Sequence, residues 1–270
     1  RLNHLVVIPA RAGSTRLPRK PLRLIAGRTL LHRTIAMARA AISDRDDVAL
    51  VVATDDEDIA AHAREAGCPA VMTDSALATG SGRALAAALS FAEGPRFVVN
   101  LQGDSPFQPE GALGAVLAAL ESGAEVATPV IALDWESLDA LREHKLLSPF
   151  SGTTCVRAPD GRALWFSKAI LPAIRDEDRL RATDRLSPVW RDVGLYGYQL
   201  EALRRFEACA PTMLERLEGL EQLRLIELGI EIMTVAVDAP RFDSSGIDTE
   251  ADISKVERMI AEHGDPTPAL

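Results

Sequence analysis

Residues 5–21 read LVVIPARAGSTRLPRKP, and this stretch decides the fold of the chain. Its apolar start, Leu5 to Ile8, predicts a strand that is buried on both faces of a parallel sheet, and Pro9 ends that strand. The loop that follows consists of small and polar residues, including Gly13 and Ser14. Because open α/β sheets bind ligands at the carboxyl ends of their strands, we expect a binding loop here.

Four cations, Arg11, Arg16, Arg19 and Lys20, lie within ten residues of this loop region. Small residues let backbone N–H groups approach phosphate oxygens, while the cations neutralise several charges at once. This combination favours a triphosphate ligand, and a basic surface turn is the alternative. The stretch contains neither GxxxxGK(S/T) nor GxGxxG, so the sequence supports neither an ATPase loop nor a dinucleotide-binding loop.

The composition limits the classes of protein to consider. The chain has 270 residues, 47% of them hydrophobic and 26% charged, which is ordinary for one large or two modest globular domains. A net charge of −9 argues against nucleic acid as a partner. The three cysteines show no CxxC spacing, which counts against zinc or a disulfide framework. No apolar run is long enough to span a bilayer, so we expect no membrane partner and a cytoplasmic protein.

Strand-like and helix-like stretches alternate along the first half of the chain. The strands are expected at residues 5–9, 48–54, 69–72, 96–101 and 125–130, and the helices near 29–42, 56–67, 82–93 and 109–122. This alternation predicts an α/β fold: a three-layer sandwich with a mostly parallel, Rossmann-like sheet.

The regular alternation of strand-like and helix-like stretches ends after about residue 131. We interpret residues 131–215 as an insert within one domain that spans 1–264. Within it, residues 174–192 are rich in Arg and Asp, which favours a mobile loop or a solvated surface stretch. The tail, 265–270, has no packing pattern and is expected to fray.

Two aspartates are candidates for catalysis. Asp104 follows the buried strand 96–101 and should lie beside the cationic loop, where a carboxylate can hold Mg²⁺ against substrate phosphates. A Gly-Asp turn on its own is more often structural. Asp248 comes just before a helical run from Glu250, so the residues alone favour a helix N-cap.

Residues 9–22, PARAGSTRLPRKPL, resemble the signature of sugar nucleotidyltransferases, most closely that of the cytidylyltransferases that activate 3-deoxy-manno-octulosonate (Kdo) to its CMP form. Further motifs stand in that family's order and extend the resemblance over nearly the whole chain. These motifs are VVATD at 51–55, NLQGDSP at 100–106, ALWFSK at 163–168, GLYGY at 194–198, LEQLR at 220–224 and GIDT at 246–249.

The resemblance implies an enzyme that couples CTP to a 3-deoxy-ulosonic acid, Kdo or a close analogue, and releases pyrophosphate, in the synthesis of surface polysaccharide or lipopolysaccharide. It makes Asp104 and Asp248 the ligands of Mg²⁺, and Lys20 and Arg16 catalytic cations that bind the departing pyrophosphate. It further implies a homodimer and gives the insert 131–215 the roles of acceptor binding and dimerisation.

The resemblance also implies which residues contact the two substrates. The nucleotide contacts are Ala10, Arg11, Ser14, Thr79, Gly80, Ser81, Arg83 and Gln102. The sugar contacts are Gln102, Asp192, Tyr196, Glu221 and Gln222. Read without the resemblance, residues 79–82 are equally a plain loop before a helix, and Tyr196 is equally a packed strand residue.

Three departures from the family's pattern concern the acceptor. Asp192 stands where the family usually has His, Thr154 stands where it has Lys, and Gly82 replaces an acid. Two potential cations are therefore missing from a site that should meet a sugar carboxylate. A different or amino-substituted ulosonic acid is one alternative, because Asp192 would suit an amine. A non-catalytic nucleotide-sugar sensor is the other, although the retained aspartates argue against it.

Overall fold

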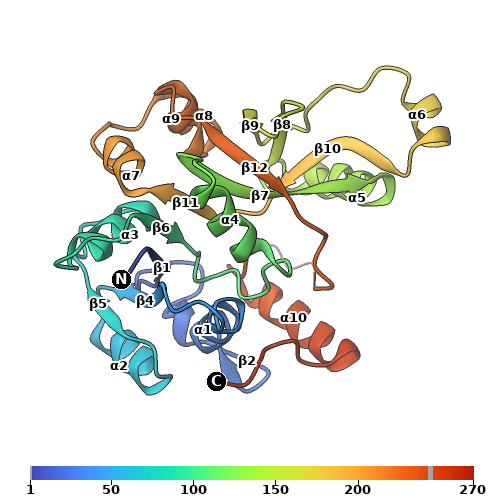
Figure 1. Ribbon diagram of the computed structural model, residues 1–270. Helices are drawn as coiled ribbons and strands as arrows, with labels where there is room; N and C mark the ends of the chain where they lie inside the picture. Colours follow the sequence, from blue (N-terminus) through green and yellow to red (C-terminus); the bar gives the residue numbers. More distant parts are fainter. Residues whose placement is uncertain (1, 243–245) are drawn as a thin grey trace.

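The computed structural model describes residues 2–242 and 246–270, and its centre is a ten-stranded sheet (Figure 1). The strand order is β5-β4-β1-β6-β11-β7-β10-β8-β9, and β12 pairs with β7. The strands are β1 (His4–Pro9), β4 (Val48–Thr54), β5 (Ala70–Met72), β6 (Phe97–Asn100), β7 (Val126–Asp134), β8 (Thr154–Arg157), β9 (Ala163–Ser167), β10 (Leu186–Asp192), β11 (Tyr196–Gln199) and β12 (Ile232–Ala236). A small hairpin, β2 (Leu24–Ile25) and β3 (Arg28–Thr29), lies apart.

Helices cover both faces of the sheet. They are a 3₁₀ helix (Lys20–Leu22) and the α-helices α1 (Leu30–Ala41), α2 (Glu57–Glu65), α3 (Gly80–Leu89), α4 (Ala112–Glu121), α5 (Trp135–Leu147), α6 (Glu177–Thr183), α7 (Leu200–Glu207), α8 (Met213–Glu218), α9 (Gln222–Glu227) and α10 (Glu250–His263). Among the residues that the structure describes, no helix has the length and apolar character needed to cross a membrane.

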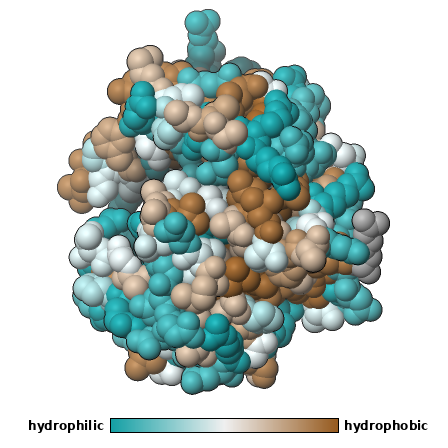
Figure 2. Space-filling view, turned by 90° about the vertical axis from the view of Figure 1, so that its left-hand side faces the viewer, coloured by the Kyte–Doolittle hydropathy of each residue, from teal (hydrophilic) through white to brown (hydrophobic). Residues whose placement is uncertain are grey.

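The first strand shows why its sequence is continuously apolar. Leu5 and Val7 pack into a core formed with α3, α7 and α9, whereas Val6 and Ile8 pack into a second core with α1, α2 and α4. Successive side chains of a strand point to opposite faces, so a strand covered on both faces needs apolar residues throughout. The predicted three-layer α/β fold is confirmed. On the face that Figure 2 shows, hydrophilic residues surround several hydrophobic patches.

The centre of the sheet contains a strand that the alternation did not predict. Strand β11 lies between β6 and β7 and runs antiparallel to both, whereas β5, β4, β1 and β6 are parallel. Its Gly197 faces α4, where a Cβ would come within 2.5 Å of Val116 Cγ1 and 2.8 Å of Leu120 Cδ1. The close approach of α4 to the sheet therefore requires glycine at this position.

We expect Gly197→Ala to lower the free energy of unfolding by about 1–3 kcal/mol, because the added methyl overpacks the contact between β11 and α4. Chemical denaturation measures this change. Gly114→Ala on α4 is the matched control, since a Cβ there meets nothing within 4 Å. In a helix interior this control should gain up to about 1 kcal/mol. Equal stability of the two variants would contradict the packing argument.

The region 131–215 continues the central sheet instead of forming a layer of its own, since β10, β8 and β9 extend it outward from β7 (Figure 1). The alternative of a solvated surface stretch holds for α6, none of whose residues is buried, whereas the prediction of a mobile loop at 174–192 is wrong, because this segment contains α6 and β10. It is fixed by alternating inward residues: Ser187 Oγ donates to Leu133 O over 2.7 Å, and Val189 is fully buried. Its many charges hide this pattern in the sequence.

The end of the chain is bound to the first helix. The guanidinium of Arg33 is fully buried and donates to Asp265 Oδ1 over 2.7 Å and to the hydroxyl of Thr267. Arg28 also donates to the carbonyl of Thr267 over 3.2 Å. A buried guanidinium requires a carboxylate partner, and the tail supplies it. These contacts argue against the prediction that residues 265–270 fray.

Candidate active site

Two carboxylates meet at the carboxyl-end edge of the sheet. Asp104 follows β6, and Asp248 precedes α10. The carbonyl of Asp104 accepts a hydrogen bond of 2.8 Å from the backbone N–H of Ile247, which joins the two segments. Thr249, not Asp248, caps α10 by accepting from Asp252 N. The prediction of Asp248 as the N-cap is therefore wrong, and its carboxylate is available for other contacts.

Lys20 lies between these carboxylates. Its Nζ is 3.1 Å from Asp104 Oδ2 and 2.9 Å from Asp248 Oδ1. Burial would lower the pKa of Lys20, but the two carboxylates outweigh burial and raise the pKa above its ordinary value of 10.5. Arg16 approaches Asp248 as well, with 3.5 Å between Nη2 and Oδ1. The structure thus brings together all four predicted catalytic residues.

The fourth cation of the loop region has a different role. Arg19 turns to α2, where its Nη2 lies 2.8 Å from Asp58 Oδ2 and 3.4 Å from Asp56 Oδ1. Arg19 therefore points away from the site, whereas Lys20 and Arg16 lie at the two carboxylates and Arg11 lies beside the start of α3.

The predicted nucleotide contacts lie around this loop and the start of α3. Thr79 caps α3 by accepting from Gly82 N over 3.0 Å, so Gly80 and Ser81 belong to its first turn. Arg11 Nη1 lies 3.5 Å from the carbonyl of Ala78, which places the loop beside this helix start. Free N–H groups at a helix N-terminus favour anions, so the arrangement suits a phosphate or a nucleotide. Ala10, at the end of β1, and Ser14, which accepts from Leu17 N over 3.3 Å, complete this side.

Arg83 differs from the other predicted nucleotide contacts. It is 2% exposed, and its guanidinium donates to the Thr73 hydroxyl and, over 3.1 Å, to the carbonyl of Leu77. These contacts hold the segment that leads into α3. A direct contact of Arg83 with the nucleotide stays a prediction.

A cavity of about 1090 Å³ opens beside the carboxylates and contains the predicted sugar contacts. Asp104, Asp248, Gln102 and Glu221 line it together with a hydrogen-bonded group of three, Asp192, Tyr196 and Gln222. Asp192 Oδ2 accepts from the Tyr196 hydroxyl over 2.9 Å and from Gln222 Nε2 over 3.1 Å. Tyr196 is thus both a packed strand residue and part of the cavity wall.

Two carboxyl groups of the cavity titrate close to neutral pH. Burial raises the pKa of Asp192 to about 6, although the Tyr196 hydroxyl opposes this shift. Burial and the charge of Glu207 raise the pKa of Glu221 to about 7. Glu221 Oε2 also accepts from Ser81 Oγ over 3.2 Å, which links the sugar side to the first turn of α3. This side of the cavity therefore carries acidic groups that can exchange protons at physiological pH.

Lys168 is a cavity residue that was not predicted as a contact, although it ends the quoted motif ALWFSK. Its Nζ donates to Thr153 Oγ1 over 3.1 Å. Burial lowers the pKa of Lys168, and the charge of Asp192 opposes this shift. Thr154, where a family lysine was expected, has its hydroxyl turned to the carbonyl of Ala169 at 2.7 Å. Lys168 therefore supplies a cation to the part of the cavity that contains Asp192.

The departure at Gly82 also has a structural explanation. A Cβ at this position would lie 3.2 Å from Glu207 Oε2. The carboxylate of Glu207, on α7, thus occupies the space that an acidic side chain at position 82 would need.

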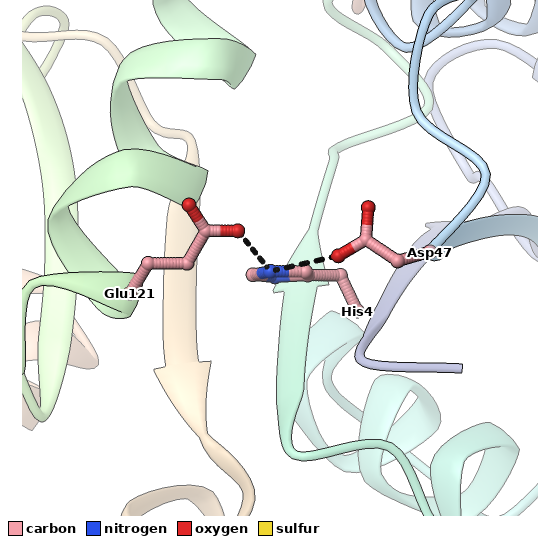
Figure 3. A group of neighbouring side chains, drawn as sticks. All are labelled: His4, Asp47 and Glu121. Atoms are coloured by element: carbon pink, nitrogen blue, oxygen red, sulfur yellow. Dashed lines mark hydrogen bonds and ion pairs between the residues drawn. The ribbon is translucent and has the colours of Figure 1, made fainter. Parts of the chain in front are cut away.

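A further acidic cluster lies at the opposite, amino end of β1. His4 Nε2 is 2.8 Å from Glu121 Oε1 and 3.9 Å from Asp47 Oδ2 (Figure 3). Three such groups could in principle hold a metal ion. However, Arg45 already binds both carboxylates, with 2.8 Å to Asp47 and 2.6 Å to Glu121. The cluster is an ion-pair network that ties β1 to the end of α4.

Comparison with known proteins identifies the family. The profile of the family described as "Cytidylyltransferase" matches residues 5–232. The chain belongs to this cytidylyltransferase family. This cytidylyltransferase is 39% identical over 263 residues to the 3-deoxy-manno-octulosonate cytidylyltransferase of Maricaulis maris (strain MCS10), and the match covers 97% of this chain and 98% of the relative. A protein of the same name from Xanthomonas oryzae pv. oryzae (strain KACC10331 / KXO85) is 40% identical over 262 residues, covering 95% and 96%.

A solved structure agrees with these relatives. It is described as CMP:2-keto-3-deoxy-manno-octonic acid synthetase complexed with CTP. Its TM-score is 0.80 at 28% identity, and the match covers 96% of this chain and 99% of that chain. The predicted family and fold are confirmed, and this cytidylyltransferase is a nucleotidyltransferase.

Proposed function

We propose that this nucleotidyltransferase couples CTP to a 3-deoxy-ulosonic acid, Kdo or a close analogue, and releases pyrophosphate. The names of the relatives and the CTP complex of the solved structure support both substrates. The observation that carries the proposal is a single cavity that contains Asp104 and Asp248 beside Lys20 and also the polar group around Asp192. The product would serve surface polysaccharide or lipopolysaccharide synthesis.

In the proposed reaction the anomeric hydroxyl of the sugar acid attacks the α-phosphorus of CTP. A new bond forms between the sugar oxygen and the α-phosphorus, the bond between the α-phosphorus and the oxygen bridging to the β-phosphate breaks, pyrophosphate leaves, and the hydroxyl proton is released to solvent. Positioning and charge neutralisation carry most of such catalysis. Arg11, Arg16 and Lys20 would bind the charges of the departing pyrophosphate, and the first turn of α3 would orient the nucleotide.

Asp104 and Asp248 fit a magnesium ion. Hard divalent cations prefer carboxylate oxygens together with substrate phosphates, and the two carboxylates here share a single ammonium group, which balances only one of their two charges. When bound, Mg²⁺ would neutralise charge on the phosphate oxygens that take part in the transfer. Lys20 would then be free to move to the triphosphate.

The sugar carboxylate would bind at Lys168. This lysine lines the cavity near Asp192, and its ammonium donates to a neutral hydroxyl, that of Thr153. Burial lowers the pKa of Lys168 below its ordinary value, and a bound carboxylate would favour its charged form again. Tyr196, Gln222 and Glu221 offer hydrogen bonds to the sugar hydroxyls.

A second candidate acceptor is an ulosonic acid that carries an amino group. The donors bonded to Asp192, which include the Tyr196 hydroxyl and the Gln222 amide, are all uncharged. A substrate ammonium would supply a cationic partner at hydrogen-bond distance. A His at this position, as the resemblance implies for the family, would not offer the substrate ammonium a carboxylate charge.

We expect the pH profile to separate these acceptors. Since the pKa of Asp192 is about 6, its carboxylate loses charge below that pH. With an amino-bearing acid, kcat/KM should fall as pH drops below 6, and Asp192→Asn should cost about 10–100-fold at pH 7.5. Asp192→His should shift the preference toward Kdo. An unchanged ratio between the two acids in both variants would contradict a role of Asp192 in selection.

The direct test is pyrophosphate release with CTP and Mg²⁺ across a panel of ulosonic acids that includes Kdo and its amino analogue. Turnover with one of them supports the transfer reaction and names the acceptor. Absence of turnover with every acid, together with CTP binding, would instead support a sensor.

We propose further that the enzyme is a cytoplasmic homodimer. Three exposed apolar side chains, Leu146, Leu147 and Phe150, lie in and just after the end of α5 and could contribute to an interface. Light scattering after gel filtration measures the mass, and a monomer at micromolar concentration would overturn the proposal of a dimer.

A further inference from the structure

One polar side chain of the cavity wall has no hydrogen-bond partner among the residues that the structure describes. Asn100, the last residue of β6, is 4% exposed and lines the cavity. Its Oδ1 is buried without a hydrogen bond, and no hydrogen bond between described residues involves its side-chain amide. Rotating the amide by 180° would exchange oxygen and nitrogen and leave the same position unpaired.

This arrangement is costly for the free protein. A buried polar atom without a partner destabilises the folded state, whereas an apolar residue would suit the strand, as Val98 and Val99 show. Asn100 pairs in register with Val7 on one side and Tyr196 on the other. A polar side chain at this point therefore calls for a hydrogen-bond partner that the described residues do not supply.

The surroundings leave room for the amide. A Cβ at Gly80 would approach Asn100 Nδ2 to 3.3 Å and Oδ1 to 3.5 Å, so glycine at the start of α3 keeps this space open. The cavity wall around the amide also contains Tyr196, Tyr198 and Glu221. The amide thus lies between the proposed nucleotide side and the proposed acceptor side.

We infer that Asn100 is a substrate-binding residue whose carboxamide pairs with a hydroxyl group of a bound sugar. The inference rests on the proposed function. A hydroxyl can donate to Oδ1 and accept from Nδ2, so it satisfies the unpaired amide on both counts. The hydroxyl belongs to the acceptor acid or to the ribose of CTP, since both sugars would bind at this cavity.

The experiment combines variants with deoxy substrates. We expect Asn100→Val and Asn100→Ala to lower kcat/KM about tenfold, with most of the change in KM for one substrate. Wild-type enzyme should prefer that substrate over its deoxy analogue about tenfold, and the variants should lose this preference. Comparing CTP with 2′-deoxy- and 3′-deoxy-CTP tests the ribose, and deoxy analogues of the acceptor test the acid.

Thermal unfolding without substrate separates binding from a structural role. Asn100→Val should have the same Tm as wild type or a higher one, because it removes an unpaired polar group. Gln199→Leu is the control: its amide donates to the carbonyls of Gly123 and Ala124, away from the cavity, and its loss should leave kcat/KM unchanged.

Each outcome decides the matter. Loss of discrimination at an unchanged or higher Tm supports the inference. Wild-type activity in both variants overturns it, as does a lower Tm with discrimination retained. If the variants do not fold, wild-type enzyme that accepts every deoxy analogue equally also overturns it. Absence of turnover in wild-type enzyme would instead contradict the proposed function.

Discussion

Asp104→Asn is expected to yield a folded protein whose kcat is lower by about 10²–10³-fold or more. The substitution keeps the size of the side chain and removes one of two negative charges at the proposed metal position. Lys20 retains Asp248 as a partner at 2.9 Å, and the carbonyl of Asp104 still accepts from Ile247 N. The loss should therefore fall on catalysis and not on folding.

Pyrophosphate release at saturating CTP measures this effect, and thermal unfolding verifies the fold. Asp160→Asn is the control, since Asp160 lies in the turn between β8 and β9 and accepts from Arg162 N. Mg²⁺ should raise the Tm of wild-type enzyme but not that of Asp104→Asn. Retained activity in Asp104→Asn would contradict the proposal that Asp104 holds the metal ion.

Lys20→Met should reduce kcat/KM for CTP by about 10²–10³-fold, because it removes a cation that would neutralise the transferred phosphates. It also leaves Asp104 and Asp248 facing each other without the ammonium that now joins them. Without metal we therefore expect a lower Tm than wild type. Added Mg²⁺ should shrink this difference, since a divalent cation neutralises the same carboxylates.

The stabilising contribution of Lys20 has a defined pH range. Because its folded pKa is raised above 10.5, the contribution is complete below that pH and is lost as pH rises through the folded value. Arg19→Gln is the matched control in the same loop, because Arg19 pairs with Asp58 and Asp56 instead. Equal losses of activity in Arg19→Gln and Lys20→Met would contradict the separate roles that the geometry gives these cations.

Much of the fold could be predicted from local pattern. The apolar run of β1 alternates between two cores, so its sequence alone indicates a strand covered on both faces. Asp56, in front of α2, accepts from Ile59 N as a helix cap, and Gly67 follows that helix with a positive φ of 74°. Such signals act over a few residues and are therefore readable along the chain.

The residues that we propose for catalysis could also be predicted from the sequence, because each lies in one of the short motifs quoted above. The resemblance was needed for Asp248, whose local pattern favours a cap. The structure gives the capping role to Thr249. A one-residue shift in the start of the helix leaves the Asp248 side chain facing the cavity instead of capping α10.

The parallel half of the sheet, the cationic loop and the carboxylate after β6 are predictable from local pattern, since periodicity and turn residues encode them over a few positions. Folding in three dimensions was needed to place β11 antiparallel between β6 and β7, to put Glu207 beside Gly82, and to bring Lys168 and Asn100 to one cavity. Each of these depends on pairing between segments far apart in the chain, where packing and burial, not local propensity, select the partner.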